Sequence, residues 1–160
     1  MVVAFLESIK YTGHLFPLAL LRVYLGYYYL HQSLDQYATL FIRQPTVEDL
    51  AHQAIQLQIA PETYLRILDA VVIPHWQMVS YIFIGIQFLV GFSYLVGLCV
   101  RPISLLAALY GFHVLSYVTG PEAALWKTLI VIHLTLGWLG AGRCLGFDYY
   151  FYRRNRGFWW

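Results

Sequence analysis

The sequence predicts an all-α integral membrane protein, an antiparallel four-helix transmembrane bundle with short amphipathic helices between spans one and two. Of its 160 residues, 60% are hydrophobic and 11% are charged, whereas soluble domains carry about 25% charged residues. The charges also lie mostly outside four long apolar runs. This composition excludes a small soluble enzyme and a disordered chain. The net charge of +2 gives no reason to expect nucleic acid as a partner.

The apolar runs match bilayer crossings, because a hydrocarbon core of ~30 Å needs ~20 helical residues. Helices are expected because lipid offers no partner to open backbone groups. Short turns at Arg101-Pro102 and Thr119-Gly120-Pro121 make the last three spans antiparallel neighbours. The predicted spans of this single domain, residues 1–160, are about 15–42, 76–99, 103–119 and 123–145. Close helix packing is expected at glycines inside the spans: Gly26, Gly85, Gly91, Gly97, Gly111, Gly137, Gly140 and Gly142.

The connection between the first two spans, residues 43–74, predicts two short amphipathic helices. Thr46 is the predicted N-cap of the first, with acidic residues in the turn that follows. Pro61 opens the second helix and Pro74 ends it. Such helices suit the mouth of the bundle or the membrane surface. The alternative interpretation is a covering loop with no catalytic role.

The distribution of lysine and arginine predicts the orientation. Six basic residues flank one side of the spans and three flank the other: Lys10, Arg101, Arg143, Arg153, Arg154 and Arg156 against Arg43, Arg66 and Lys127. Because cytoplasmic loops carry the excess of basic residues, both termini are predicted to be cytoplasmic and residues 43–74 extracytoplasmic. Residues 1–10 are expected to form an interfacial amphipathic helix, and residues 153–160 a basic, aromatic membrane anchor.

Polar side chains inside the spans are the candidate binding residues, because they are costly in lipid. Arg22 and Tyr29 share one helical face, and His31 shares a neighbouring face with Asp35 at i,i+4. Gln87 must bond another helix or a ligand. The remaining candidates are His113, Lys127 and His133. For Arg22, a structural role within the bundle and a ligand-binding role both remain open.

A haem held jointly by His113 and His133 is not expected. From the turn at Gly120-Pro121, His113 lies ~10 Å and His133 ~18 Å below the outer end, a mismatch of roughly 8 Å. Packing histidines or donors to a quinone carbonyl fit better, and a single-histidine haem or pigment ligand stays open. No metal site is predicted, and Cys99 and Cys144 are interpreted as small apolar fillers.

Four stretches carry motifs. The first span contains Leu21-Arg22 with Gly26 and ends with Leu34-Asp35-Gln36, and the second contains Gln87-x-x-x-Gly91 followed by Leu95–Arg101. The third motif is Trp126-Lys127 before the fourth span, and the last is Gly140-Ala141-Gly142-Arg143 with Asp148 after it. Over roughly residues 15–150 the chain resembles the DoxX/DoxD family of small four-span bacterial and archaeal membrane proteins. Two positions depart from that pattern. Gln87 stands where the family usually has glutamate, which puts a proton-coupled role there in doubt, and Gln36 stands where lysine is common.

The resemblance implies a bacterial or archaeal cytoplasmic membrane and a redox setting, since DoxD is the small subunit of a thiosulfate:quinone oxidoreductase. It adds Arg143 to the candidates, beside Arg22, Gln87 and Lys127. The leading hypothesis is a membrane subunit of a quinone-linked electron-transfer complex, with Arg22 or Lys127 stabilising reduced quinone. The alternative is a noncatalytic subunit of a larger respiratory or photosynthetic complex that contacts lipid, carotenoid or chlorophyll.

Overall fold

A computed structural model describes residues 13–150 of the chain and contains no β-strand in that range. The elements in chain order are η1 (Gly13–Leu15), α2 (Phe16–Ala38), η2 (Leu40–Ile42), α3 (Thr46–Gln56), α4 (Glu62–Ile67), the π-helix η3 (Leu68–Val72), α5 (Trp76–Val96), α6 (Val100–Leu115), α7 (Gly120–Leu139) and η4 (Ala141–Arg143). The all-helical prediction is therefore confirmed for these residues. The interfacial helix predicted at residues 1–10 and the anchor predicted at residues 153–160 lie outside them.

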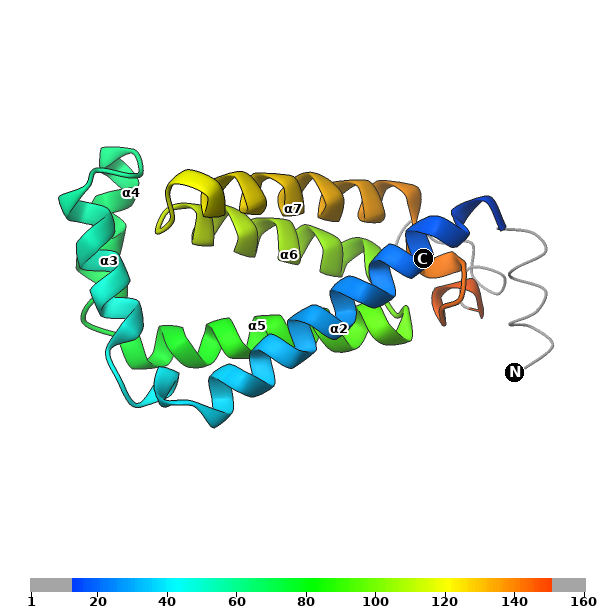
Figure 1. Cartoon of the computed structure of the whole chain (residues 1–160), viewed down its shortest axis with the longest axis horizontal. Coiled ribbons are helices and arrows are strands. Elements are labelled where there is room, and N and C mark those ends of the chain that lie inside the picture. Colours follow the sequence, from blue (N-terminus) through cyan, green and yellow to red (C-terminus); the bar gives the residue numbers. More distant parts are fainter. Residues whose placement is uncertain (1–12, 151–160) are drawn as a thin grey trace.

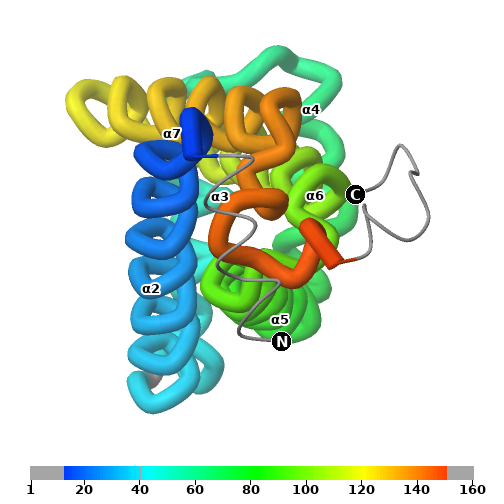
Figure 2. Tube along the Cα trace, turned by 90° about the vertical axis from the view of Figure 1, so that its right-hand side faces the viewer, coloured from blue at the N-terminus to red at the C-terminus, as the bar shows by residue number. Residues whose placement is uncertain are grey.

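The four long helices α2, α5, α6 and α7 form the body of the structure (Figure 1). α2 packs against α5, α6 packs against α7, and α5 also contacts α6. Figure 2 shows that α2 and α7 cross at a steep angle rather than running side by side. The chain enters α2 and leaves α7 at the same end of the bundle (Figure 1).

Glycines set the close approach of α2 to α5, as the sequence predicts. A Cβ atom on Gly26 would lie 2.7 Å from the backbone nitrogen of Leu95, and one on Gly91 would lie 2.6 Å from the nitrogen of Leu30. The two backbones therefore touch at this crossing, which any side chain would push apart. The same prediction is wrong for Gly85, where an added Cβ would meet nothing within 4 Å.

Two glycines also allow close packing between α6 and α7. A Cβ on Gly111 of α6 would lie 2.8 Å from Cγ1 of Ile130, and one on Gly137 of α7 would lie 2.9 Å from Cβ of Ser104. Each small residue accepts a side chain from the facing helix. This pair and α5 then enclose an apolar cluster that includes Val90, Ala107 and Leu136.

Several predicted helix ends are corrected by the structure. α6 begins at Val100 and not after Pro102, because the chain reverses at Gly97–Cys99, whose ends have φ values of +72° and +52°. Pro102 lies in the first turn of α6, where its missing N–H costs no helical hydrogen bond. α2 ends at Ala38 rather than near Ile42.

The last predicted span, 123–145, is also corrected. α7 begins earlier, at Gly120, with Pro121 in its first turn, and it ends at Leu139. Gly140 ends the helix because its φ of +65° is left-handed, a conformation that a helix cannot continue. The residues that follow, 141–148, fold back as the short helix η4 and a turn.

The helices α3 and α4 with η3 form a cap across one end of the bundle (Figure 1). The cap has its own apolar cluster, which contains Val47, Ala51, Ala54, Leu68, Val72 and Tyr117. The two predicted short helices are thus confirmed. The predicted N-cap is wrong, because Thr46 is the first helical residue and Pro45 precedes it without a side-chain cap hydrogen bond.

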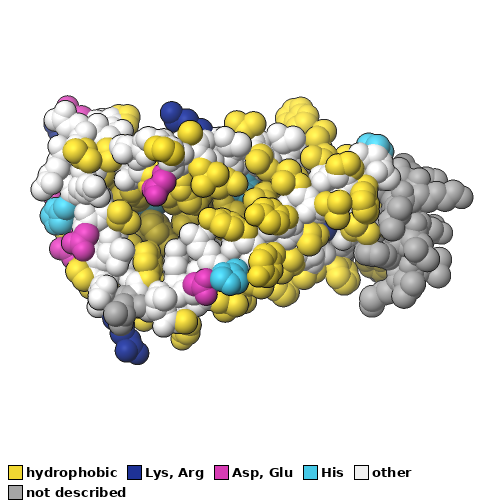
Figure 3. All heavy atoms as spheres, in the orientation of Figure 1, with side chains coloured by type: hydrophobic (Ala, Val, Ile, Leu, Met, Phe, Trp, Pro, Cys, Tyr) yellow, Lys and Arg dark blue, Asp and Glu magenta, His cyan; other side chains and the backbone are white. Residues whose placement is uncertain are grey.

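Hydrophobic side chains cover much of the bundle surface, whereas most charged side chains on the same face gather toward the cap (Figure 3). Among residues 13–150, α5 and α7 are long and apolar enough to cross a membrane by length and composition, and α6 is apolar but shorter. The structure thus supports a membrane association for an all-helical protein.

Candidate functional site

Arg22 is a fully buried cation near the end of the bundle opposite the cap. Its guanidinium donates hydrogen bonds to the carbonyl oxygens of Ala141 at 3.3 Å and Leu145 at 2.9 Å. Both acceptors belong to residues 140–148, the segment after α7, which we call the strap. Arg22 therefore faces the inside of the bundle, and its direct partners are backbone groups of the strap.

Asp148, at the end of the strap, is the acidic counterpart of Arg22. Its carboxylate accepts hydrogen bonds from the backbone N–H groups of Cys99 at 2.7 Å and Val100 at 3.0 Å. Asp148 thereby caps the first turn of α6 from a distant position in the sequence. Burial raises the pKa of its carboxyl group above the usual value, while these two hydrogen bonds and the charge of Arg22 oppose that rise.

Three glycines leave room for this buried pair. A Cβ on Gly97 would lie 2.3 Å from an Arg22 nitrogen, one on Gly146 would lie 2.6 Å from the same atom, and one on Gly142 would lie 2.1 Å from a carboxylate oxygen of Asp148. The glycines of the family-like motifs at positions 97 and 142 therefore serve packing around charged groups. The sequence signal for this site was the motif that ends at Asp148, which the sequence analysis did not assign to any site.

His133 is the centre of a second buried network. Its Nε2 is 2.8 Å from the Tyr29 hydroxyl of α2, and its Nδ1 is 2.9 Å from the Tyr94 hydroxyl of α5. Tyr94 donates in turn to the Ser104 hydroxyl at 3.0 Å. Since the proton of Tyr94 goes to Ser104, its oxygen is left to accept from Nδ1–H, and Nε2 accepts from Tyr29. This network ties α2, α5, α6 and α7 together.

His133 and Gly137 of α7 face different helices. The partners of His133 lie on α2 and α5, whereas Gly137, one turn along α7, packs on α6. Tyr29, Tyr94 and His133 are all fully buried. No sequence period links positions 29, 94 and 133, so only the fold reveals that they meet.

Gln87 on α5 lies in the core and donates from Nε2 to the Tyr110 hydroxyl of α6 at 2.5 Å. Its Oε1 is buried without a hydrogen-bond partner. The prediction that Gln87 bonds another helix is confirmed. The unpartnered oxygen leaves one strong acceptor in the middle of the bundle.

His113 lies at the opposite end of α6 and connects the bundle to the cap. Its Nδ1 bonds the Tyr64 hydroxyl of α4, and its Nε2 is 2.9 Å from the Tyr117 hydroxyl. Phe83 packs edge-on against the same imidazole. Both ring nitrogens of His113 and of His133 are thus used by different tyrosines, an arrangement that leaves neither histidine a nitrogen for an iron atom.

Two further candidates are Lys127 and Arg143. Lys127 is exposed on α7, and Arg143 is half-buried in η4, within the strap. The structure therefore brings Arg22 together with Asp148, and Tyr29 together with His133, but it does not bring Lys127 to either group. Cys99 and Cys144 are both free thiols, and residues 13–150 contain no group of three or more side chains suited to hold a metal ion.

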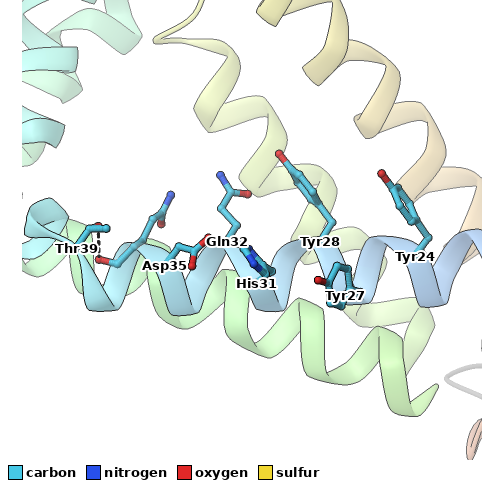
Figure 4. A pocket seen from close by; sticks show the side chains of 8 residues that line it. Tyr24, Tyr27, Tyr28, His31, Gln32, Asp35 and Thr39 are labelled. Atoms are coloured by element: carbon cyan, nitrogen blue, oxygen red, sulfur yellow. Dashed lines mark hydrogen bonds and ion pairs between the residues drawn. The ribbon is translucent and has the colours of Figure 1, made fainter.

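A recess of about 420 Å³ lies along α2, on the part nearest the cap (Figure 4). Its lining combines aromatic, amide and charged side chains: Tyr24, Tyr27, Tyr28, His31, Gln32, Asp35, Gln36 and Thr39. Tyr24, Tyr28 and Gln32 point toward α6 and α7 in Figure 4, whereas Tyr27 and His31 lie on another side of the helix. The Oε1 atoms of Gln32 and Gln36 are buried without a hydrogen-bond partner.

His31 and Asp35 form the predicted i,i+4 pair. The imidazole Nδ1 lies 2.7 Å from a carboxylate oxygen, and both side chains are more than half exposed, at 58% and 62%. The ring of Tyr27 lies next to this pair, at a centroid distance of 5.8 Å from the His31 ring.

Comparison of the chain with models of known protein families, with curated proteins and with solved structures finds no match. The DoxX/DoxD resemblance therefore stays a prediction from the residues that carry it.

Proposed function

We propose that α2, α5, α6 and α7 all cross the bilayer. α5 and α7 have the required length and composition. The 23 residues of α2 span ~34 Å at ~1.5 Å per residue, enough for a crossing. Large hydrophobic side chains are exposed on all four helices, including Leu20, Phe88, Leu109 and Trp138. Lipid would cover this surface, which is unusual for a soluble monomer.

The orientation follows from the charges at the two ends of the bundle. In the sequence, six basic residues flank the span ends on the side of the two termini and three flank the other side, so we propose that both termini lie in the cytoplasm of a bacterial or archaeal cell. The cap then lies outside. An even number of crossings agrees with the chain entering and leaving at one end (Figure 1).

We propose further that the protein is a membrane subunit of a quinone-linked electron-transfer complex, similar in role to the DoxX/DoxD family. The observation that supports this is the α2 recess, which joins tyrosine rings and amide groups on a helix that would face the bilayer. Ligand sites of this kind combine apolar walls with a few placed polar groups. A lipid-soluble aromatic ligand could reach the recess from the membrane.

The residues present fit a quinone head group. Gln32 and Gln36 each have a buried amide oxygen that lacks a partner. A glutamine amide offers an oxygen that accepts from a quinol hydroxyl and a nitrogen that donates to a quinone carbonyl. The same two side chains would therefore hold either redox form, beside the ring of Tyr28.

A bound quinone would supply reversible two-electron, two-proton chemistry, and we propose that a partner subunit exchanges the electrons. In this arrangement the roles first expected for two cations change. Arg22 is sealed beneath the strap, where it holds backbone carbonyls, and Lys127 is exposed on α7. Gln32 and Gln36 become the polar groups at the quinone site.

Binding of a short-chain quinone to the purified full-length protein in lipid nanodiscs tests this proposal. Titration with decylubiquinone, followed by quenching of intrinsic fluorescence, should saturate. The double substitution Gln32→Leu and Gln36→Leu should raise Kd at least tenfold, because about 1–3 kcal/mol is lost per unmade hydrogen bond. Gln77→Leu, an exposed glutamine on α5, is the matched control. Equal Kd values for all three proteins would contradict the site.

One observation favours the alternative of a noncatalytic subunit. The Tyr29–His133 network and the Asp148 carboxylate find their partners within the chain and need no ligand. Absence of saturable quinone binding, together with co-purification in a larger complex, would support that reading. A visible absorption spectrum of the purified protein would further reveal a carotenoid, chlorophyll or haem.

A further inference from the structure

The outward side of α2 carries polar groups where a membrane-spanning helix should meet lipid. The column of Tyr27, His31 and Asp35 follows an i,i+4 spacing, and each of its side chains is more than half exposed. Counting from Ala38, the end of α2, Asp35 lies ~5 Å and His31 ~10 Å into the span. An exposed imidazole–carboxylate pair at that depth is costly in lipid and calls for cover.

The exposed residues around this column indicate which kind of structural element could pack against it. Alternating steps of four and three residues along α2 mark a seam in which every member is exposed: Leu20, Tyr24, Tyr27, His31, Leu34 and Ala38. A repeat of 3.5 residues is the pattern by which one helix packs along another in a left-handed pair. The seam therefore fits a single long helix lying nearly parallel to α2.

We propose that the occupant is the α2 helix of a second copy of this chain, so that the protein is a homodimer in the membrane. The proposal rests on the membrane placement proposed above, but not on quinone binding. Its argument is self-complementarity. A two-fold axis along the membrane normal sets the same column of each copy against the other, at the same depth.

The column satisfies itself in either charge state. His31 uses Nδ1 to bond Asp35, and its Nε2 enters no hydrogen bond within residues 13–150. If the imidazole is neutral, Nε2 accepts and the Tyr27 hydroxyl of the other copy donates. If the imidazole is charged, Nε2–H donates and the Asp35 carboxylate of the other copy accepts. Each copy thus provides both a donor and an acceptor for the other copy.

The dimer seam borders the α2 recess, because Tyr24, Tyr27 and His31 belong to the seam and also line the recess. Tyr28 and Gln32 point toward α6 and α7, away from the side that carries Tyr27 and His31 (Figure 4). Figure 3 shows one acidic side chain beside one histidine over α2, with hydrophobic side chains next to them. A second copy would cover this pair and with it one wall of the α2 recess, and it would leave Tyr28 and Gln32 on the side of α6 and α7.

Cysteine cross-linking in native membranes tests the interface. Leu34→Cys places a thiol on the seam, and Leu109→Cys places one on an equally exposed position of α6, at 53% and 58% exposure. Mild oxidation should join Leu34→Cys into a dimer of twice the chain mass, while Leu109→Cys and the wild type, with Cys99 and Cys144 alone, should stay monomeric. A dimer formed equally by all three proteins, or a Leu34→Cys product that contains a different protein, would overturn the proposal.

The contribution of the polar column is measured separately. The double substitution His31→Leu and Asp35→Leu should raise the dimer dissociation constant about tenfold in detergent, as read by native mass spectrometry, with an unchanged helical circular dichroism spectrum. An unchanged dissociation constant would refute the role of the column. Decylubiquinone titration of the Leu34→Cys protein separates the two proposals. Absence of saturable quinone binding together with intact Leu34→Cys cross-linking would contradict the quinone site and leave the dimer supported.

Discussion

Arg22 in α2 and Leu145 in the strap lie 123 positions apart in the sequence, yet the guanidinium donates a 2.9 Å hydrogen bond to that leucine's carbonyl oxygen. The strap in turn places Asp148 on the first turn of α6. A buried cation thus fixes the far end of the chain against the helices that precede it. This closure motivates the first two predictions.

Replacing Arg22 should destabilise the bundle strongly. Arg22→Leu leaves the carbonyls of Ala141 and Leu145 without their donor and removes the positive charge near the Asp148 carboxylate. The free energy of unfolding should fall by about 3–5 kcal/mol. Arg22→Lys keeps the charge but loses the planar fork, so its effect should be intermediate. Thermal unfolding in detergent measures both. Lys127→Leu, which removes an exposed cation, should leave the midpoint nearly unchanged, and equal losses for Arg22→Leu and Lys127→Leu would contradict the assignment.

The stability contributed by Asp148 should depend on pH with a defined sign. Because burial raises the pKa of this carboxyl, the folded state binds its proton more tightly than the unfolded state, whose pKa is about 4. The contribution is therefore complete below pH ~4 and is lost as pH rises through the folded pKa. The thermal midpoint of the wild type relative to Asp148→Asn should fall over a pH series that starts near 4. A difference that grows with pH would show the opposite sign.

Two glycine substitutions should have opposite outcomes. Gly97→Ala forces a Cβ to 2.3 Å from Arg22 at a residue with φ of +72°, so it should lower stability by several kcal/mol. Gly85→Ala meets nothing within 4 Å inside α5 and should be neutral or stabilise by about 0.5–1 kcal/mol, because alanine favours helix. Expression level and unfolding midpoint compare them. A tolerated Gly97→Ala would disprove the close approach to Arg22.

Tyr29→Phe should weaken the link between α2 and α7. The change removes the hydroxyl that bonds His133 Nε2 at 2.8 Å and leaves a buried acceptor unpaired, a loss of about 1–3 kcal/mol. Tyr37→Phe, at a tyrosine with 67% exposure, is the control. Nitrogen-15 NMR of histidine-labelled protein should show His133 with its proton on Nδ1. An Nε2–H signal in the wild type would contradict the assigned hydrogen-bond direction.

Features that depend on neighbours along the chain could be predicted from the sequence. The His31–Asp35 pair follows from the i,i+4 spacing of a helix, and the turn at Gly120-Pro121 follows from the local chemistry of its residues. Arg22 faces inward because it shares a helical face with Gly26, which meets α5. In each case one helical period or one turn contains the whole physical cause.

The sequence by itself determined that the chain is helical, that its long helices are apolar, and that a pair of short helices separates the first two of them. Only the tertiary structure decided which polar groups meet: Arg22 with Leu145, Tyr29 with His133, and Asp148 with the start of α6. Such partners lie on different elements of the fold, and their meeting depends on the crossing angles of the helices and on their relative positions along the bundle axis. No helical period carries that information. The packing of glycines against facing backbones sets it instead.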